Sequence, residues 1–452
     1  MLYQFIVDNY KSFRDETTLN LAAASYSDHS NHVCEGYIKN TRFLKSTVLY
    51  GANASGKTNL INAISFASEL IVNGTVGEMP IALNNFRLSK KLRNKPSRFE
   101  FIFEFASKVY HYGFVLTTDQ ILEEWLSERT NSGDKLIFER FSRDGKAVVK
   151  PGKKIFKSKP KRDLLGFVAQ TTRVNQLFLK EAFEKNISEI KNVFRFFSDK
   201  LQIIPALSVD YRFLEIRTHS DESFSDFLGR ILKDVGTGIE KIATETFDLD
   251  FDKHLPELDA REREYISSHI RKEGAAITLD DAKGGGNKFF IYNDTEKGPQ
   301  ILRLRAMHKD DEGNLVSFEL KEESAGTRRY LNLLPLLYDT QAVDRVYIVD
   351  ELDRRLHPDL VRVFLEHFFK LNENNRSQLI FTTHNTQIMD QELLRRDEIW
   401  FIEKDLEKGA STLYPLTDMS VRKDLKLDKA YLHGRFGAVP KINRSFLYSN
   451  PN

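Results

Sequence analysis

The chain has 452 residues, of which 41% are hydrophobic and 12% aromatic, so it is long enough for one large domain or two to three ordinary ones. Its 67 basic and 65 acidic residues leave a net charge of +2, which gives no case for bulk attraction to nucleic acid or membranes. Cys34 is the only cysteine, so an internal disulfide is excluded and a reducing, cytoplasmic setting is expected. No apolar run reaches the length of a membrane span and no signal core precedes Asp8, so neither membrane insertion nor secretion is expected.

A complete phosphate-loop motif follows an early predicted strand. Residues 46–50 are mostly apolar and prone to form a strand, and residues 51–58 read Gly-Ala-Asn-Ala-Ser-Gly-Lys-Thr. This matches the G-x-x-x-x-G-K-[ST] pattern, which requires a strand before it and a helix after it. Residues 60–71 place apolar side chains on one helical face, so the required context is predicted. A glycine turn that binds nothing is the rival interpretation, and it leaves the full motif unexplained.

Each position in this loop has a physical role in holding a nucleotide. Gly51 and Gly56 allow the backbone to wrap closely around an anion, and the loop amides and the helix N-terminus hold the phosphates. Lys57 is expected to reach the β- and γ-phosphates of ATP, and Thr58 to ligate Mg²⁺ through its hydroxyl. The other predicted contacts from this segment are Ala54, Ser55 and Asn59.

The middle of the chain changes from strand patterns to helical patterns. Residues 98–105 alternate with period two, and residues 110–116 form another such run after a short turn, which predicts an antiparallel β-lobe. Residues 175–200 and 223–246 read as helical, the second with a break at 236–238. No heptad repeat is sustained, so we expect a compact helical insert and no long coiled coil.

A basic stretch lies inside this insert. Its cationic residues surround Pro160 and are Lys153, Lys154, Lys157, Lys159, Lys161 and Arg162. Such a cluster suits the phosphates of a nucleic acid, with salt-dependent affinity, but it also suits a solvated surface loop. The sequence therefore leaves nucleic acid open as a partner.

A short serine–glycine element at residues 323–329, Glu-Ser-Ala-Gly-Thr-Arg-Arg, can open a helix. Ser324 is a favoured N-cap residue, so an ordinary helix start is one interpretation. The other is that Ser324, Gly326 and the helix amides face a phosphate. Because the chain already has one phosphate loop, this element would then serve the nucleotide of a second copy.

Two acidic residues follow the predicted strand at 346–349. The carboxyl ends of parallel strands carry the ligand-binding residues in open α/β folds, so Asp350 is expected to hold Mg²⁺, usually through water. Glu351 points to the other side and is expected to orient or deprotonate the attacking water. An acidic turn without function is the alternative, which the complete phosphate loop disfavours.

Another apolar strand, residues 379–383, ends at His384. A histidine there can hydrogen-bond the γ-phosphate or the attacking water. Between this strand and the acidic one, Pro358 suits the first position of a helix. The order of strand, helix and strand favours a catalytic role for His384 over a structural one.

In combination these segments resemble the ATP-binding-cassette-type heads of SMC, RecF and OLD proteins. Residues 5–14, Phe-Ile-Val-Asp-Asn-Tyr-Lys-Ser-Phe-Arg, are similar to the first strand and "NF-x-SF" start of such heads. That similarity makes Lys11 and Ser12 candidate contacts of the nucleotide near its base. Asn53 matches the asparagine common in the phosphate loop of these heads, and Asp353 resembles their D-loop aspartate, which works across a dimer.

A closer resemblance covers nearly the whole chain. It is to the stand-alone AAA family ATPases of bacterial anti-phage defence, of the RloA or abortive-infection type, with the ATPases of PARIS and Septu systems as more distant relatives. The segments that carry it are residues 232–239, 323–329, 350–358, 395–400 and 432–440. It implies a cytoplasmic ATPase that works with a separately encoded effector, a Toprim-like nuclease or a toxin, with a phage protein as candidate trigger. Ser-Ala-Gly at 324–326 departs from the Ser-Gly-Gly of transporters, and Gln120 is only a weak candidate for a Q-loop glutamine.

The predicted fold is an α/β, ABC-type P-loop ATPase head: a mixed sheet with helices, an antiparallel β-lobe and a helical insert. We assign residues 1–130 to its N-terminal half, 131–300 to a mainly helical insert, 301–405 to its C-terminal half and 406–452 to a tail. The predicted function is Mg²⁺-dependent ATP hydrolysis by an ATP-sandwiched homodimer or higher homo-oligomer that controls an effector, without a membrane partner. Two alternatives remain: a RecF-like DNA-repair ATPase acting directly on DNA, and a nucleotide-sensing scaffold with little turnover.

Overall fold

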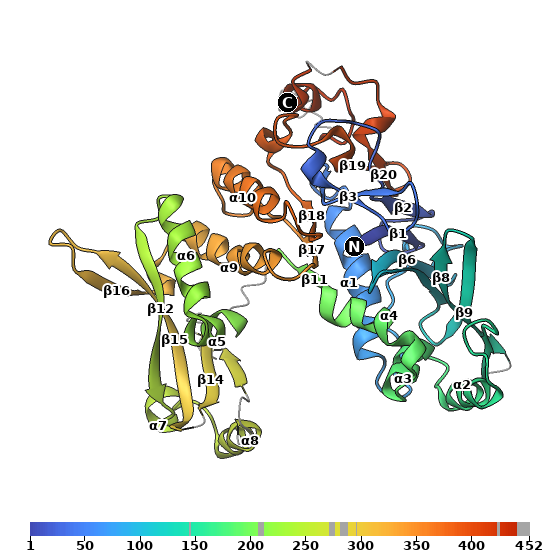
Figure 1. Cartoon of the computed structure of the whole chain (residues 1–452), viewed down its shortest axis with the longest axis horizontal. Coiled ribbons are helices and arrows are strands. Elements are labelled where there is room, and N and C mark those ends of the chain that lie inside the picture. The colour runs from blue at the N-terminus through green and yellow to red at the C-terminus, as the bar shows by residue number, and fades with distance from the viewer. Residues whose placement is uncertain are drawn as a thin grey trace, which may run out of the picture. The chain divides into compact units, whose positions relative to one another are not determined.

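The chain forms two compact units in a computed structural model that describes residues 1–143, 146–206, 212–270, 276–280, 288–294, 296–422 and 425–440. Unit 1 comprises Met1–Ala206, Ala342–Asp353 and Val361–Asn452, and unit 2 comprises Leu207–Gln341 and Arg354–Leu360. Figure 1 shows both units and labels most of their helices and strands. Each unit therefore draws on segments that are far apart in the sequence.

A six-stranded sheet in unit 1 carries the predicted nucleotide motifs. Its order is β11-β17-β18-β5-β19-β20, in which neighbouring strands from β11 to β19 are parallel and β20 is antiparallel to β19. The bounds are β11 Leu201–Ile204, β17 Val346–Val349, β18 Gln378–Thr382, β5 Ser46–Tyr50, β19 Ile399–Lys404 and β20 Ser411–Pro415. Every residue of β5, β17 and β18 is buried, as expected for central strands of a parallel sheet, which are covered on both faces.

A seven-stranded antiparallel sheet forms the other layer of unit 1. Its order is β10-β9-β8-β7-β6-β1-β2. The bounds are β10 Lys146–Pro151, β9 Gly133–Arg143, β8 Ile121–Thr130, β7 Lys108–Leu116, β6 Ser97–Phe105, β1 Leu2–Asp8 and β2 Thr17–Asn20. Helix α1, Lys57–Asn73, contributes to one hydrophobic core with both sheets, in which Ile64 of α1 joins Phe101 of β6 and Ile380 of β18. The two sheets and α1 thus share a single core (Figure 1).

Shorter elements complete unit 1. They are β3 Val33–Glu35, β4 Arg42–Leu44, α2 Lys159–Thr171, α3 Phe178–Glu184, α4 Lys191–Arg195, α10 Pro358–Leu371 and α11 Leu427–Leu432. Helix α10 begins in the segment assigned to unit 2 and continues in unit 1. Its buried side chains, among them Phe364 and Phe368, recur at the spacing of one helical face.

Unit 2 combines a five-stranded antiparallel sheet with helices. Its strands are β12 Ile239–Asp248, β13 Ala276–Asp280, β14 Lys288–Asp294, β15 Gly298–Lys309 and β16 Leu315–Glu319, in the order β12-β15-β14-β13 with β16 also on β15. Its helices are α5 Arg212–Ser220, α6 Glu222–Asp234, α7 Phe251–His254, α8 Ala260–Ile270 and α9 Ala325–Thr340. Phe224 and Phe227 of α6 pack on Tyr338 of α9 with ring centroids 5.0 and 5.2 Å apart. Because these contacts join α6 to α9, the helix that begins with the serine–glycine element is anchored in unit 2.

The units divide the chain differently from the predicted boundaries. The antiparallel sheet continues through β9 and β10 beyond residue 130, and β20 extends the parallel sheet beyond residue 405. The region predicted as a mainly helical insert also contains strands, and residues 239–246, predicted to be helical, belong to strand β12. The physical reason is that Gly236 and Gly238 adopt left-handed backbone angles, with φ of 74° and 78°, which end α6 and allow an extended chain to follow.

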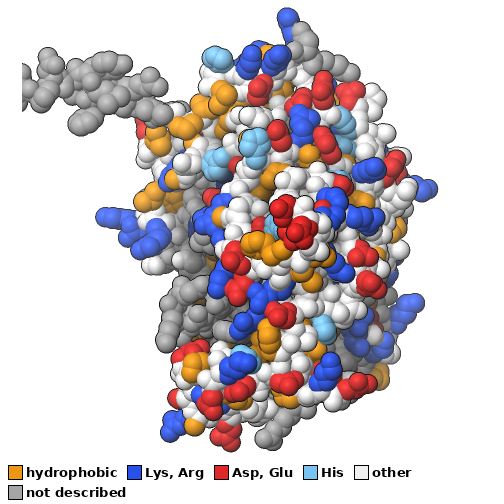
Figure 2. Space-filling model, turned by 90° about the vertical axis from the view of Figure 1, so that its left-hand side faces the viewer, with side chains coloured by type: hydrophobic (Ala, Val, Ile, Leu, Met, Phe, Trp, Pro, Cys, Tyr) orange, Lys and Arg blue, Asp and Glu red, His pale blue; other side chains and the backbone are white. Residues whose placement is uncertain are grey.

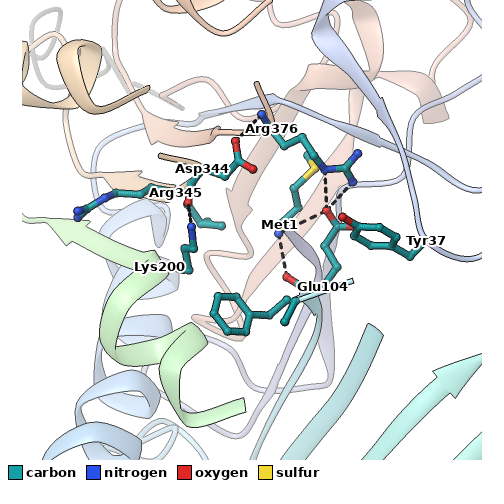
Figure 3. Close-up of a pocket in the computed structure, with 10 residues that line it drawn as sticks. Met1, Tyr37, Glu104, Lys200, Asp344, Arg345 and Arg376 are labelled. Carbon is teal, nitrogen blue, oxygen red and sulfur yellow. Dashed lines mark hydrogen bonds and ion pairs between the residues drawn. The ribbon is translucent and has the colours of Figure 1, made fainter. Parts of the chain in front are cut away.

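A network of ionic contacts lies at the amino ends of the parallel strands. Glu104, at the end of β6, pairs with Arg376, which precedes β18, through contacts of 2.5 and 3.1 Å. Asp344 accepts from the backbone of Arg376 through its side chain and from Lys200 Nζ through its carbonyl, at 2.8 and 2.6 Å. These residues converge around a cavity of about 330 Å³ (Figure 3). Since β17 starts beside the cavity at Val346 and ends before Asp350, this network lies at the sheet edge opposite to the nucleotide motifs.

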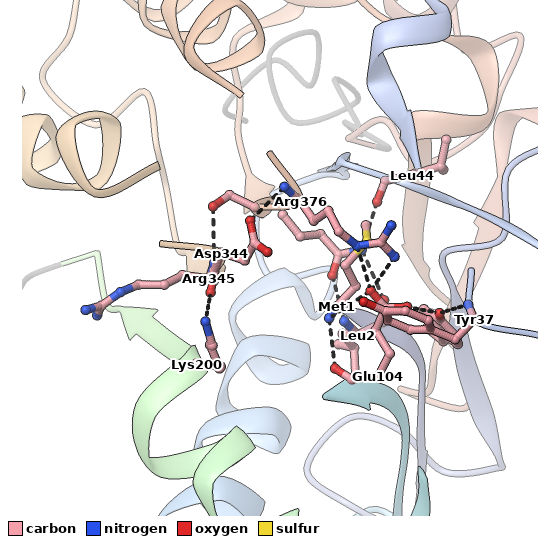
Figure 4. A network of polar contacts seen from close by, with 12 residues as sticks. Met1, Leu2, Tyr37, Leu44, Glu104, Lys200, Asp344, Arg345 and Arg376 are labelled. Atoms are coloured by element: carbon pink, nitrogen blue, oxygen red, sulfur yellow. Dashed lines mark hydrogen bonds and ion pairs between the residues drawn. The ribbon is translucent and has the colours of Figure 1, made fainter. Parts of the chain in front are cut away.

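The fully buried side chain of Gln378 extends this network to the antiparallel sheet. Its amide group accepts from Leu2 N at 2.9 Å and donates to the carbonyls of Leu2 and Leu44 at 3.1 and 2.8 Å. Figure 4 shows Leu2 close to Met1 and Glu104, and Leu44 at the upper right of the network. A buried amide that satisfies both donor and acceptor groups joins the two sheets without leaving backbone polar groups unpaired.

Charged side chains of both signs are interspersed over the face shown in Figure 2. This distribution agrees with the near-neutral balance of the whole chain. In the part of the chain that the structure describes, no helix combines the length and the apolar character needed to cross a bilayer.

Candidate nucleotide site

The phosphate-loop motif forms the predicted strand, loop and helix. Strand β5 ends at Tyr50 and α1 begins at Lys57. Between them the loop turns sharply: Ala54 has a φ of 61° and Gly56 a φ of 118°. The second value lies in a region that side chains other than glycine rarely adopt. The motif therefore depends on the glycine at 56 for its shape.

The loop is also closed by tight packing around its first glycine. A Cβ atom on Gly51 would lie 2.4 Å from the carbonyl oxygen of Ile402 and 2.5 Å from Ser55 Oγ. No side chain fits at these distances, so position 51 requires glycine. Asn53 and Ala54 are exposed on the outer side of the loop, and Ser55 is buried.

The N-terminus of α1 is suited to receive an anion. In the described structure its N-cap, Gly56, provides no side-chain cap, and the first turn contains no acidic residue. The amides of the first turn are therefore not capped by a carboxylate or hydroxyl of the described chain. Helix amides and a favourable helix dipole together form an anion site.

Lys57 lies at the centre of the charges of the site. Its buried ammonium donates to the carbonyl oxygens of Gly51 and Ala52 at 2.7 and 3.1 Å. Burial lowers the pKa of Lys57 from 10.5 to about 8, against the opposing effect of the carboxylates of Asp350 and Glu351. The same interactions show that the acidic motif and the phosphate loop meet in unit 1.

Two serines from segments that are distant in the sequence, Ser411 and Ser12, form hydrogen bonds with the phosphate loop and the first turn of α1. Ser411 Oγ, at the start of β20, donates to the carbonyl of Ser55 at 2.6 Å, and Ser411 N donates to the carbonyl of Ser12 at 2.8 Å. Ser12 Oγ accepts from Asn59 Nδ2 at 2.8 Å. A Cβ on Gly56 would lie 2.4 Å from Ser411 Oγ. The loop, the first turn of α1, residue 12 and β20 thus form one hydrogen-bonded assembly.

The structure places the predicted residue Ser12 against the phosphate loop, and Lys11 next to it. Lys11 has a left-handed backbone with φ of 48°, and its amide donates to the carbonyl of Asn84 at 2.7 Å. Burial lowers the pKa of the Lys11 side chain. Ser12 therefore lies at the phosphate loop, and contact of Lys11 and Ser12 with a nucleotide stays a prediction.

The two acidic residues are oriented by one threonine of the neighbouring strand. Thr382 Oγ1, at the end of β18, donates to Asp350 Oδ1 at 2.6 Å and accepts from the backbone of Glu351 at 2.7 Å. Asp350 is buried, and Glu351 adopts a left-handed backbone with φ of 48°. A non-glycine residue in this region is strained, and such strain is concentrated at functional sites.

His384 and Asp353 face each other at the same edge of the sheet. The backbone amide of His384 donates to Asp353 Oδ2 at 3.1 Å. Desolvation and the Lys57 ammonium lower the pKa of His384, and the nearby carboxylates oppose this shift. At neutral pH the imidazole is therefore mainly uncharged, the state in which one ring nitrogen can donate and the other accept.

The serine–glycine element lies in unit 2. Ser324 is the N-cap of α9, and its exposed hydroxyl accepts from the backbone of Thr327 at 3.0 Å. A Cβ on Gly326 would lie 2.8 Å from the carbonyl of Arg355. The backbone of Arg355, two residues after Asp353, therefore packs closely against the first turn of α9 within unit 2.

The residues present fit ATP with Mg²⁺. The loop offers backbone amides and Lys57 for phosphates, and Thr58 is exposed in the first turn of α1. Thr58 and Asp350 would supply hard oxygen ligands, which Mg²⁺ prefers. Among the described residues no group of three or more His, Cys, Asp or Glu could hold a metal ion. The remaining magnesium ligands would come from phosphate oxygens and water, as is usual for this ion.

Gln120 does not lie among these residues. It belongs to the turn between β7 and β8, where its carbonyl accepts from Thr117 N at 2.9 Å. The strand that lies next to the acidic motif is β11. Its last residue, Ile204, accepts a hydrogen bond from Asp350 N at 3.0 Å. Gln120 therefore has a turn position in the antiparallel sheet.

Sequence reasoning did not identify Thr382 and Ser411 as parts of the site. A hydroxyl residue at the end of a predicted strand beside the acidic one was a usable signal for Thr382. Ser411 offered no such signal, because its partner Ser55 is 356 residues away in the sequence. Only the pairing of β19 with both β5 and β20 brings it to the loop.

A known family model matches most of the chain. Residues 46–390, roughly three quarters of the chain, match a family model described as "AAA domain, putative AbiEii toxin, Type IV TA system". A search of curated proteins found no match.

Several solved structures are similar to the chain at low identity. An SMC head bound to the C-terminal winged-helix domain of ScpA is 12% identical with a TM-score of 0.42, covering 93% of this chain and 98% of that chain. The SMC head domain from Thermotoga maritima is 13% identical with a TM-score of 0.37, covering 93% and 99%. An SMC head with an extended coiled coil, bound to the C-terminal domain of ScpA and derived from Pyrococcus furiosus, is 13% identical with a TM-score of 0.37, covering 96% and 99%.

Proposed function

The chain belongs to the AAA-domain family described for AbiEii-like toxins of type IV toxin–antitoxin systems, and on this premise we propose that it is an ATPase that self-associates around ATP. In the proposed cycle, the phosphate loop of one copy binds ATP, and the serine–glycine element of a second copy covers it. Hydrolysis then separates the two copies. Dimers are the minimum assembly, and higher homo-oligomers follow the same rule.

One observation supports this proposal above the others. Lys57, Asp350, Glu351 and His384 influence one another electrostatically within unit 1, whereas Ser324 is exposed at the start of α9 in unit 2. A helix N-terminus with an exposed serine suits a phosphate, and the phosphate loop already serves the nucleotide of its own copy. The simplest arrangement in which both the phosphate loop and the serine–glycine element contact a nucleotide is one in which the element contacts the ATP bound by a second copy.

The residues of the site have distinct tasks in the proposed reaction. Lys57 and the loop amides bind the phosphates and hold them in place. Glu351 orients the attacking water and accepts its proton, and the uncharged imidazole of His384 hydrogen-bonds that water or the γ-phosphate. Thr58 and Asp350 would hold Mg²⁺, which would neutralise phosphate charge. Positioning and electrostatics supply most of the rate enhancement in such reactions.

We propose further that the cycle controls a separately encoded effector, a nuclease or a toxin, in anti-phage defence, with a phage protein as trigger. The family description, which names a toxin of a type IV system, supports this role. The rival function, a nucleotide-sensing scaffold, requires negligible turnover. Phosphate release measured with and without the product of the adjacent gene separates the two.

Mixing two inactive variants tests the shared site. Lys57→Ala lacks the phosphate grip but keeps its serine–glycine element, and Ser324→Arg keeps its phosphate loop but blocks the element with a bulky cation. Each variant alone is expected to be inactive. In the mixture, one of the two sites of a mixed dimer combines an intact loop with an intact element, so phosphate release should return to about a quarter of the wild-type rate if copies exchange freely.

The control is a mixture of each variant with the double variant Lys57→Ala/Ser324→Arg. The pairing of Ser324→Arg with the double variant has no intact element, and the pairing of Lys57→Ala with it has no intact loop. Both control mixtures should stay inactive. Activity of the Ser324→Arg variant alone, or no recovery in the first mixture although mixed dimers form, would contradict the shared site.

A further inference from the structure

A dense group of lysines is exposed on unit 1 next to helix α2. Between residues 153 and 163 the chain has six basic residues and one acidic residue, Asp163. The side chains of Lys153, Lys154, Lys157 and Lys159 are exposed. Within the described structure, only Lys161 of this segment forms a salt bridge, to Glu189 at 2.6 Å. Among the described residues, the four exposed lysines therefore have no carboxylate partner.

The lysines are held together by the fold of the segment. Arg162, in the first turn of α2, donates from Nη1 to the carbonyls of Phe156 and Lys157 at 2.8 and 2.7 Å. Phe156 is fully buried in the core of unit 1. The backbone at Phe156 and Lys157 is thus held against the start of α2, where Lys159 lies.

These charges do not stabilise the helix on which they lie. Lys159 and Lys161 fall in the first turn of α2, which contains no acidic residue. Positive charges are unfavourable there, because the helix dipole is positive at its N-terminus. Lysines at a helix N-terminus destabilise that helix, and residues that break a local stability rule in this way are typical of functional sites.

Two large apolar side chains are exposed on the same helix. Phe167 is 63% exposed and Leu164 is 47% exposed. They are three residues apart and therefore lie on one face of α2, whereas Leu165 and Val168 are buried on the other. Phe167 lies about two helical turns after Lys159 on the same helix, so exposed lysines for phosphate contacts and an exposed ring for base stacking follow one another along this segment.

We infer that this surface, formed by Lys153, Lys154, Lys157, Lys159, Leu164 and Phe167, binds single-stranded nucleic acid. The exposed lysines match the charge of a phosphate backbone, and the ring of Phe167 can stack on an unpaired base. A membrane fits the observations less well, because two apolar side chains form too small an apolar face for interfacial insertion. The binding does not depend on the nucleotide site, since no residue of that site belongs to the surface.

Fluorescence anisotropy with a labelled oligothymidine tests this inference. Replacing the four lysines by alanine should weaken binding about tenfold or more. It should also reduce the slope of log affinity against log salt by about 3, because each phosphate neutralised by a lysine contributes about 0.7 to that slope. Phe167→Ala should weaken oligothymidine binding about fivefold or more while affecting a duplex of the same length little. Both variants should retain wild-type phosphate release, which verifies that unit 1 is folded.

The matched control replaces four other exposed lysines of unit 1, Lys39, Lys90, Lys91 and Lys95. This control variant loses the same four positive charges. If it lost as much oligothymidine binding as the first variant, overall charge would explain the loss, and the inference would be overturned. Unchanged binding by the four-lysine variant would also overturn it. So would binding of wild-type protein to phosphatidylglycerol vesicles without binding to the oligonucleotide, which would identify a lipid surface as the partner.

Discussion

Thr382 donates a hydrogen bond of 2.6 Å from its hydroxyl to Asp350 Oδ1. Thr382 is the last residue of β18, and Asp350 directly follows the neighbouring parallel strand β17. The same hydroxyl accepts from the backbone of Glu351. One buried side chain therefore fixes both the acid proposed to hold Mg²⁺ and the acid proposed as the base.

Replacing Thr382 by valine should impair magnesium use. The change keeps the shape of the side chain but removes both hydrogen bonds, so Asp350 loses its orientation. Loss of such a supporting partner typically costs 10- to 100-fold in metal affinity or activity. The measurement is phosphate release as a function of Mg²⁺ concentration. Thr382→Ser, which keeps the hydroxyl, should stay close to wild type, and an unaltered magnesium dependence in Thr382→Val would speak against this role.

Glu351→Gln should bind ATP but hydrolyse it at least about 100-fold more slowly, because general base catalysis contributes roughly 10²- to 10⁴-fold. The amide cannot accept the proton of the attacking water. Copies joined around ATP should then accumulate, which light scattering with and without ATP measures. Wild-type turnover in this variant would remove Glu351 from its assigned role.

ATP binding should take up a proton between about pH 8 and pH 10.5. Burial places the pKa of Lys57 at about 8 in the free protein, below its usual 10.5, and phosphate contacts favour the charged form and raise it again. The charged fraction of Lys57 falls as pH rises through its pKa, so the apparent affinity for ATP should decline above about pH 8.

Calorimetry in buffers with different ionisation enthalpies measures this proton uptake. Lys57→Arg provides the control, because a guanidinium stays charged over the whole range. If this variant binds ATP, its binding heat should not depend on the buffer. A binding heat of the wild-type protein that is independent of the buffer at these pH values would contradict the assignment.

Ser411→Ala should weaken ATP binding about five- to tenfold with little change in kcat. The variant leaves the carbonyl of Ser55 without its 2.6 Å donor, and an unsatisfied buried group costs about 1–3 kcal/mol. Titration with a fluorescent ATP analogue and steady-state kinetics separate the two effects. Thr412→Ala, at the exposed next position, is the matched control and should behave as wild type.

Glu104→Gln should destabilise unit 1 by about 2–4 kcal/mol, because removing one partner of a buried ion pair leaves the other uncompensated. Arg376 would lose the carboxylate to which it now donates twice. Urea unfolding measures the loss. Glu139→Gln removes the exposed ion pair with Lys150 and should cost less than about 1 kcal/mol. Equal effects of the two variants would refute the role of Glu104.

Local patterns predicted the elements that depend on local physics. The strand, loop and helix around residues 51–58 and the buried strand before Asp350 lie where their apolar patterns and glycines placed them. Residues 239–246 show the limit of this reasoning: the spacing of Ile239 and Ile242 fits a helical face, but pairing with β15, with an irregularity between residues 239 and 241, makes the segment a strand.

The sequence by itself determined the chemistry available to this protein: a phosphate loop, two acids, a histidine and a serine–glycine element in a fixed order. Tertiary structure alone decided which of them meet. Parallel pairing of β5, β18 and β17 brings Lys57, Asp350 and His384 to one edge of unit 1, while Ser324 begins a helix of unit 2. The reason is physical: spacing along the chain fixes helices and turns, but strand partners are chosen by burial between segments hundreds of residues apart.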